Sequence, residues 1–315
     1  MENVYKIGCF SDSPLSLPGW IQWNEKKWGL YAETVLYNKQ NKKYPYLKGI
    51  VYKDKSGRIT LPPLNPYLPF EFADIRIGND GLYADYQYVM ELFIEDLKKH
   101  GIKDKLILPP GFIDTRYFIW NGFAVDVRYT FLQYFTKMSG CAKHIRKNIN
   151  KAERAGYTVD ISYDWDKIVY CLAGTENKKH FSYNITSADI KNCAELLEND
   201  IVRGYLVKDK DGLPVSGGVR LVKKGGGVID WVQGTIASHL KNGVNQLLYD
   251  FVLTHAKEDE CRYFDWCGAN IPSVALAKSA WGGTLTPYIM IMEKSLHRVL
   301  YNYYKPIVKK ICGKT

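Results

Sequence analysis

Two charged residues of this 315-residue sequence could reach a substrate, one because glycines lie close by and the other because it lies at the end of a predicted strand. Lys278 lies shortly before the pair Gly282–Gly283, and its ammonium group could reach a phosphate or a developing oxyanion. Asp265 follows the β-prone dipeptide Tyr263–Phe264, and its carboxylate could hold or deprotonate an amine. We expect both to be catalytic. Lys278 could equally be a surface lysine, and Asp265 could cap a turn through the next backbone amides.

Three further side chains could contact a substrate. Trp231 and Gln233 belong to the β-prone segment IDWVQG (229–234), and Trp266 follows Asp265 directly. We expect all three to line a substrate channel. A strand also buries tryptophan for packing alone, and that alternative stays open.

The segment HLKNGVNQLL (239–248) has the composition of a helix start. Backbone amides at a helix N-terminus bind phosphate, so we expect Lys241, Gly243 and Asn245 to hold the phosphate of a cofactor or co-substrate. A plain Asn-Gly helix start is the alternative.

The formal net charge is +10, and two short segments account for it. Residues 292–315 and residues 136–157 each carry six Lys or Arg against one Glu. Such clusters attract phosphate-bearing partners, nucleic acid or anionic lipid. Arg146 and Arg154 could bind a substrate diphosphate, because a guanidinium pairs well with phosphate oxygens. The alternative is a solvated helix face.

Several classes of protein are excluded by the sequence. There is no G-x-S-x-G, H-E-x-x-H or Walker motif, so serine hydrolases, zinc proteases and P-loop enzymes have no support. The six histidines lack ligand spacing, and we assign no metal. No apolar run is long enough to span a bilayer, and the N-terminal residues lack a secretory signal. Together with seven cysteines at irregular spacings, this predicts a cytoplasmic location.

An internal repeat indicates how the chain positions these residues. KGIVYKDKSGRI (48–59) and RGYLVKDKDGLP (203–214) each predict a β-hairpin with a charged turn. Five residues of the first copy recur at a constant offset of 155: Gly49, Lys53, Asp54, Lys55 and Gly57. We therefore predict that residues 45–108 and 200–266 superpose as one hairpin, helix and strand unit.

The order of elements after each hairpin supports the duplication. An amphipathic helix is predicted over 89–101 and a strand over 104–108. The second copy has a similar helix over 247–259 and a strand over 261–266. We infer two copies of one mixed α/β domain.

A boundary is expected between the copies. The segment 124–135 alternates like a closing strand, and 141–157 has helical periodicity with a C-terminal glycine. In that helix, Ile145, Ile149 and Ala152 fall on one side, and lysines form a basic ridge on another.

Five segments carry a resemblance to a known family: HIRKNINKAERAGYTVDI (144–161), LPPLNPYLPF (61–70), GYLVKDKDGLPVSGGVRLV (204–222), YFDWCGA (263–269) and ALAKSAWGG (275–283). In this order they resemble the motifs of FemABX (Fem-type) aminoacyltransferases, proteins with two tandem GNAT-like acyltransferase domains.

The resemblance implies an α/β (α+β) fold with mixed sheets flanked by helices. It implies a first GNAT-like domain over 1–137 and a second over 138–292 that carries the active site. A basic C-terminal helix over 293–315 would pack back on the first domain. Segment 239–248 lies where a GNAT domain places its pyrophosphate loop.

The implied function is transfer of an acyl or aminoacyl group to an amine of a cell-wall (peptidoglycan) precursor, or of another nucleotide- or lipid-linked saccharide or peptide. The donor would be acyl-CoA or aminoacyl-tRNA, with no tightly bound cofactor. The main partner would be a phosphate-bearing acceptor. A tRNA and a peripheral contact with a membrane are further options. Two alternatives stay open: an acyl-CoA-dependent N-acetyltransferase acting on a sugar or peptide amine, and a non-catalytic module that binds RNA or anionic lipid.

Overall fold

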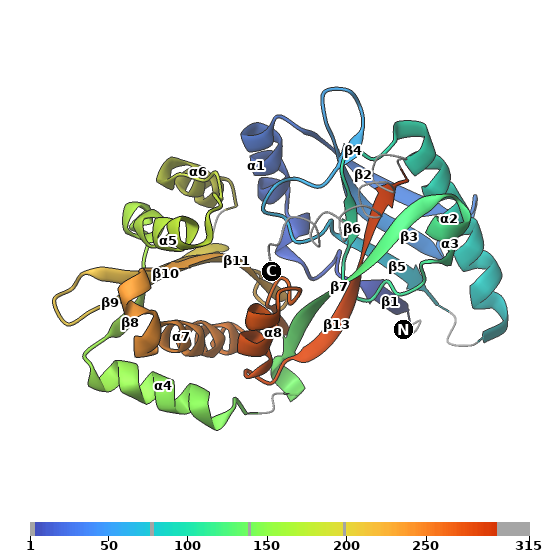
Figure 1. The fold of residues 1–315 in the computed structure, drawn as a ribbon. Helices are drawn as coiled ribbons and strands as arrows, with labels where there is room; N and C mark the ends of the chain where they lie inside the picture. The colour runs from blue at the N-terminus through green and yellow to red at the C-terminus, as the bar shows by residue number, and fades with distance from the viewer. Residues whose placement is uncertain (1–3, 76–78, 138–139, 198–199, 295–315) are drawn as a thin grey trace, which may run out of the picture.

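The computed structural model describes residues 4–75, 79–137, 140–197 and 200–294, and it is an α/β structure built on two sheets (Figure 1). The helices are α1 (Pro18–Trp28), α2 (Asn79–His100), α3 (Arg116–Trp120), α4 (Lys143–Arg154), α5 (Trp165–Lys179), α6 (Ser187–Leu197), α7 (Val244–Glu258) and α8 (Pro272–Ser279). The strands are β1 (Tyr5–Gly8), β2 (Tyr31–Asn38), β3 (Tyr46–Lys53), β4 (Ile59–Thr60), β5 (Phe70–Asp74), β6 (Leu106–Leu108), β7 (Phe123–Tyr134), β8 (Thr158–Ile161), β9 (Val202–Lys208), β10 (Pro214–Val222), β11 (Gly227–Thr235), β12 (Tyr263–Asp265) and β13 (Thr284–Glu293).

The first half of the chain forms a five-stranded sheet. Its order is β1-β5-β3-β2, with β4 paired to β3, and all of these pairs are antiparallel. Apolar residues of α2 and α3 pack on this sheet in one core cluster, which includes Phe93 and Phe118. The cluster also includes Ile289 and Ile291 of β13, so this late strand helps to close the first core.

The second sheet has eight strands in the order β6-β13-β7-β12-β11-β10-β9-β8. Its long strands β7 and β13 pair over their whole common length, from Phe123–Glu293 to Leu132–Thr284. At one end β13 pairs with β6, and at the other end β7 pairs with β12. Within the eight-stranded sheet, this ribbon therefore links β6 of the first half to the strands of the second half (Figure 1).

Helices cover both faces of the second half. The helices α5 and α6 lie on one face of β9–β11, and α7 with α4 lies on the other (Figure 1). The periodicity of α4 explains its orientation, because Ile145, Ile149 and Ala152 are buried while its lysines are exposed. The helix α1 of the first half packs against α6, and its Trp20 and Trp23 meet Trp231 of β11 edge to face.

Strand β12 ends before its neighbour β11 does, and this leaves space beside the second half of β11. They pair in parallel only from Gly227–Tyr263 to Ile229–Asp265. Beyond that point β12 ends, whereas β11 continues to Thr235 beside β10. The second half of β11 therefore has a free edge on the side where β12 would have continued.

The structure confirms most predicted elements and corrects one. Helices and strands occur where they were predicted in both halves, and both charged turns are hairpin turns. The predicted superposition of 45–108 with 200–266 is wrong in its strand pairing. In the first half β4 has two residues and β5 pairs directly with β3, whereas in the second half β11 pairs with the nine-residue β10. The proline-rich segment 61–70 follows β4, and prolines cannot donate hydrogen bonds to a sheet ladder.

The predicted C-terminal helix lies almost wholly outside the described residues, because Glu293 ends β13 and the description stops at residue 294. Within the described ranges, no helix is both long enough and apolar enough to cross a membrane.

Close packing around Gly204 of β9 gives a test of the fold. A Cβ atom on Gly204 would overlap the backbone oxygen of Ser162 and the side chain of Trp165. We expect Gly204→Ala to lower the free energy of unfolding by about 3 kcal/mol, because backbone atoms cannot move aside. Gly140→Ala is the control, since a Cβ there meets nothing within 4 Å. Equal urea midpoints for the two variants would contradict the packing described.

Candidate functional site

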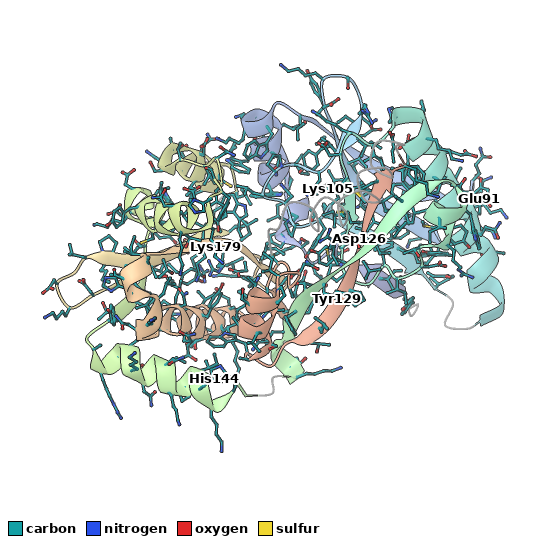
Figure 2. All side chains as sticks on the ribbon, in the orientation of Figure 1. Glu91, Lys105, Asp126, Tyr129, His144 and Lys179 are labelled. Atoms are coloured by element: carbon teal, nitrogen blue, oxygen red, sulfur yellow. The ribbon has the colours of Figure 1, made fainter. Side chains whose placement is uncertain are left out.

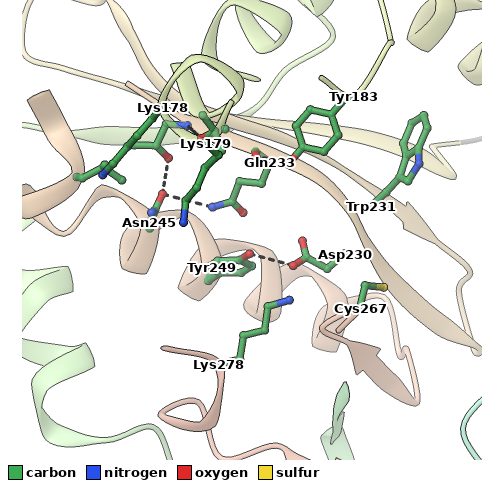
Figure 3. Close-up of a pocket in the computed structure, with 14 residues that line it drawn as sticks. Lys178, Lys179, Tyr183, Asp230, Trp231, Gln233, Asn245, Tyr249, Cys267 and Lys278 are labelled. Carbon is green, nitrogen blue, oxygen red and sulfur yellow. Dashed lines mark hydrogen bonds between the residues drawn. The ribbon is translucent and has the colours of Figure 1, made fainter. Parts of the chain in front are cut away.

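A cavity of about 530 Å³ lies beside the free part of β11 (Figure 3). The strand β11 forms one wall, the last turns of α5 form a rim, and α7 contributes Asn245 and Tyr249. Cys267 and Lys278, which follow β12, close one end. The cavity therefore occupies the space beside β11 beyond the end of β12.

A β-bulge sets which side chains of β11 meet α7. Val232 pairs with Val219 and Asp230 pairs with Arg220, so Trp231 is an extra residue in the ladder. Without it, Asp230 and Gln233 would point to opposite faces, because side chains alternate along a strand. The bulge brings Asp230 and Gln233 to one face and turns Trp231 toward the tryptophans of α1.

Arg220 lies on the same face and is fully buried. Its Nε atom forms an ion pair with Asp230 Oδ1 at 2.8 Å. Its Nη2 atom donates a hydrogen bond to Gln233 Oε1, and Nη1 donates to the carbonyl oxygen of Val232 at 3.2 Å. The guanidinium group also lies over the ring of Tyr249, at 5.3 Å from its centroid. One buried cation thus contacts three side chains of the cavity wall.

The neighbouring sequence makes room for this cation. A Cβ atom on Gly218 would lie 2.5 Å from Arg220 Nη1, so a larger residue would displace the guanidinium group. Across the ladder Arg220 pairs with Arg203, which has its own carboxylate partner in Asp259. Each arginine is therefore neutralised separately.

Helix α7 completes the polar face through two side chains one turn apart. Asn245 Oδ1 accepts hydrogen bonds from Thr235 Oγ1 at 2.5 Å and from Gln233 Nε2 at 3.3 Å. The hydroxyl of Tyr249 donates to Asp230 Oδ2 at 2.9 Å. Burial and the nearby charge of Asp230 raise the pKa of Tyr249 well above its ordinary value, so the phenol keeps its proton.

Lys278 braces the turn that follows β12. Its Nζ atom donates hydrogen bonds to the carbonyl oxygens of Trp266 and Gly268, the latter at 2.9 Å. Between them Cys267 has a φ of 50°, a left-handed conformation that is rare for a residue other than glycine. Burial, followed by the charges of Asp265 and Asp230, raises the pKa of Cys267 well above its ordinary value. Its thiol is therefore neutral.

The cavity carries uncompensated positive charge. Lys178 and Lys179 reach it from the last turn of α5, and both are exposed (Figure 3). Neither they nor Lys278 forms an ion pair with a carboxylate of the described residues. Among the described residues that line the wall, Asp230 has the only carboxylate, and it already faces Arg220. The cavity is consequently suited to an anion.

A second cavity of about 200 Å³ adjoins the first. Leu64, Asn65 and Pro66 of the first half line it, together with Ile229. Three residues border both cavities: Asp230, Trp231 and Cys267. The indole N–H of Trp231 is buried and has no hydrogen-bond partner among the described residues. We call these three residues the waist.

Four of the residues predicted from the sequence meet in the larger cavity: Lys278, Trp231, Gln233 and Asn245. Gly243 does not line it. Gly243 is the N-cap of α7 with a φ of 83°, and a Cβ there would overlap the backbone of Asn148. Lys241 is exposed, and its carbonyl oxygen accepts a hydrogen bond from Lys151.

Asp265 and Trp266 are fully buried beside the site. Asp265 accepts hydrogen bonds from the hydroxyls of Tyr67 and Thr130, each at 2.7 Å, and from the backbone amide of Cys267 at 2.9 Å. Burial raises the pKa of Asp265. These bonds join the end of β12 to β7 and to the first half. The Trp266 indole donates to Gln133.

Arg146 and Arg154 lie on α4, away from the cavity. Figure 2 shows the α4 side chains projecting outward, with His144 on the far side of the sheet from Lys179. Arg146 forms an exposed ion pair with Asp250 at 3.6 Å, and Arg154 borders a shallow groove with Lys147 and Lys151.

Sequence reasoning missed Arg220, Asp230, Tyr249, Lys178, Lys179 and Cys267. A charged residue inside the apolar run GGVRLV was a signal for Arg220, since a buried arginine requires a partner. The bulge that orients Asp230 has no signature in the sequence. Within the part of the chain that the structure describes, no group of three His, Cys, Asp or Glu side chains could hold a metal ion.

No protein-family model matches the sequence, and no curated protein sequence does. Solved structures are nevertheless similar over almost the whole chain. A structure of FemX has a TM-score of 0.59 at 14% identity, and covers 92% of this chain and 94% of its own. The C-terminal domain of a putative lysylphosphatidylglycerol synthetase from Agrobacterium fabrum has a TM-score of 0.58 at 10% identity, with coverages of 94% and 92%. L-PGS from Bacillus licheniformis has a TM-score of 0.55 at 10% identity, with coverages of 95% and 98%.

These similarities confirm the predicted fold. The chain has an α/β fold similar to that of FemX, as its short motifs indicated.

The neutral thiol at the waist gives a test of the site. Because the pKa of Cys267 is raised, its thiolate fraction should keep rising tenfold per pH unit above the ordinary cysteine range. We expect the rate at which iodoacetamide labels Cys267, followed by mass spectrometry of its peptide, to climb from pH 7 to pH 10 without a plateau. Glutathione in the same solution is the control and should level off near its own pKa. A Cys267 plateau at the same pH would contradict the raised pKa of its thiol.

Proposed function

We propose that this protein is an N-acyltransferase, which moves an acyl or aminoacyl group from a phosphate-bearing donor to an amine. One observation carries the proposal: a basic cavity and a smaller cavity meet at a waist that contains the carboxylate of Asp230. Two substrates could enter from separate sides and react there. The FemX-like fold supports the same reaction class by analogy.

The donor would occupy the larger cavity. Lys178 and Lys179 would contact its phosphate groups at the rim. An ammonium group has three N–H donors, and Lys278 uses two of them on backbone carbonyls. The third would stabilise the negative charge that develops on the donor's carbonyl oxygen or leaving group.

The acceptor would approach Asp230 through the smaller cavity. Its amine nitrogen attacks the acyl carbon, the bond from that carbon to the donor's oxygen or sulfur breaks, and the amine loses one proton. Asp230 is the carboxylate at the waist that could accept this proton, and Tyr249 and Arg220 fix its orientation. A direct transfer needs no covalent nucleophile, and the neutral Cys267 thiol is poorly suited to be one.

We extend the proposal to the partners that the motifs imply. The acceptor would be a cell-wall precursor or another nucleotide- or lipid-linked saccharide or peptide, and the donor acyl-CoA or aminoacyl-tRNA. The protein would act in the cytoplasm. Asp265, buried and satisfied by three donors, would act by positioning the Cys267 turn.

The groove on α4 favours a second candidate function. Its lysines and Arg154 form an exposed basic ridge, which a non-catalytic module could use to bind RNA or anionic lipid. Such a module would not depend on the waist.

Lys278 separates the two functions. We expect Lys278→Met to lower the turnover number for amide formation about 100-fold, the scale of a lost oxyanion donor. Lys278→Arg should restore little, because a planar guanidinium does not reproduce a compact ammonium charge. The assay offers acetyl-CoA or an aminoacylated RNA minihelix as donor to a mixture of primary amines, with the amide detected by mass spectrometry.

Lys257→Met is the matched control, since Lys257 is an exposed lysine on α7, outside both cavities. A Lys278→Met variant that is folded and turns over like the wild type would remove Lys278 from the mechanism. If neither of the two donors yields an amide, the proposed function is contradicted.

A further inference from the structure

The segment that follows α5 is held in a fixed conformation by Glu176. The backbone amide of Tyr183 donates to Glu176 Oε1 at 2.6 Å, and the hydroxyl of Ser182 donates to the same oxygen at 3.1 Å. The amides of His180 and Phe181 donate to the backbone carbonyl of Glu176. His180 has a φ of 54° and ends the helix. Four hydrogen bonds to one residue therefore shape this turn.

The turn displays an aromatic pair at the rim of the larger cavity. Tyr183 lines the cavity, and its hydroxyl donates to the carbonyl oxygen of Gln233 at 3.0 Å. The ring of Phe181 meets the ring of Tyr183 edge to face, with 4.8 Å between their centroids. Phe181 is 43% exposed although large apolar side chains are usually buried. The apolar ring of Phe181 is thus exposed to solvent beside the cavity.

Two cations share the same rim. Lys178 and Lys179 precede the turn and line the cavity (Figure 3). Helix α5 ends here, and no carboxylate of the described residues forms an ion pair with either ammonium group. An exposed ring next to two free cations at one cavity mouth combines the two contacts that a nucleotide requires, a stacking surface for its base and positive charge for its phosphates.

We propose that the rim formed by Lys178, Lys179 and Phe181 binds a nucleotide, with the base stacked on Phe181 and the phosphates at the two lysines. The inference rests on the proposed function in one respect, which is that this nucleotide belongs to the acyl donor. The same chemistry has two sources, because a nucleotide can belong to a coenzyme or can end an RNA chain. In either case the acyl group would extend inward from the rim toward Lys278 and the waist.

Binding of adenosine 3′,5′-bisphosphate by the full chain, measured by calorimetry, tests this rim without any acyl transfer. Phe181→Ala should weaken this binding about tenfold or more, the effect of one lost base stack. The same variant should leave the affinity for inorganic pyrophosphate unchanged. Replacing Lys178 and Lys179 together by Gln should weaken the binding of both probes, and Phe181→Trp should restore the affinity for the nucleotide.

Tyr170→Ala is the matched control, since Tyr170 is a 56% exposed aromatic of α5 that lines neither cavity. Equal affinities of wild type and Phe181→Ala for the bisphosphate would overturn the proposal. So would a wild type that binds pyrophosphate as tightly as the bisphosphate, which would indicate an anion site only.

Competition then distinguishes the two sources. Displacement of the bisphosphate by coenzyme A assigns the rim to a coenzyme, and displacement by the trinucleotide CCA assigns it to RNA. If neither competitor displaces the bisphosphate, the proposal is wrong. If the protein binds the nucleotide but forms no amide, the nucleotide site at the rim is supported and only the proposed function is contradicted.

Discussion

The candidate site depends on one buried charge. The guanidinium group of Arg220 lies inside the second half of the fold, where an unpaired cation would cost several kcal/mol. Its partners are Asp230, Gln233 and the ring of Tyr249, all of which border the larger cavity. The need to satisfy this cation therefore fixes the orientation of the cavity wall. Two local features of the sheet make room for the guanidinium group: the glycine at position 218 and the bulge at Trp231.

The same features explain why two cavities meet where they do. The bulge directs Trp231 toward the tryptophans of α1, so one strand contacts α7 on one face and the first half of the chain on the other. Strand β12 ends at Asp265, whose three hydrogen bonds hold the following turn and hence the Cys267 backbone at the waist. Two cavities with a shared wall thus arise where the two halves meet, and neither half alone supplies both of them.

The sequence predicted the elements of this fold well, because hydrophobic periodicity and turn residues are local signals. It singled out Lys278 through a short motif, Trp231 and Gln233 through a β-prone segment, and Asn245 through a helix start. It failed at Asp230, because alternation along β11 is reset by a bulge that only the paired strand reveals. The sequence could not show that Asp265 lies outside the cavity. Its carboxylate accepts hydrogen bonds from the hydroxyls of Tyr67 and Thr130, which are far away in the chain. The offset of 155 misled because matching turns do not guarantee matching strand pairing.

A double-mutant cycle on Arg220 and Asp230 tests most directly the claim that this pair organises the site. Urea unfolding would be measured for the wild type, Arg220→Met, Asp230→Asn and the double variant. We predict that each single variant loses about 3–5 kcal/mol, because each leaves a buried charge without its partner. The double variant should lose far less than the sum of the two, since neither charge remains. Losses that simply add would contradict the account and show that Arg220 and Asp230 act independently.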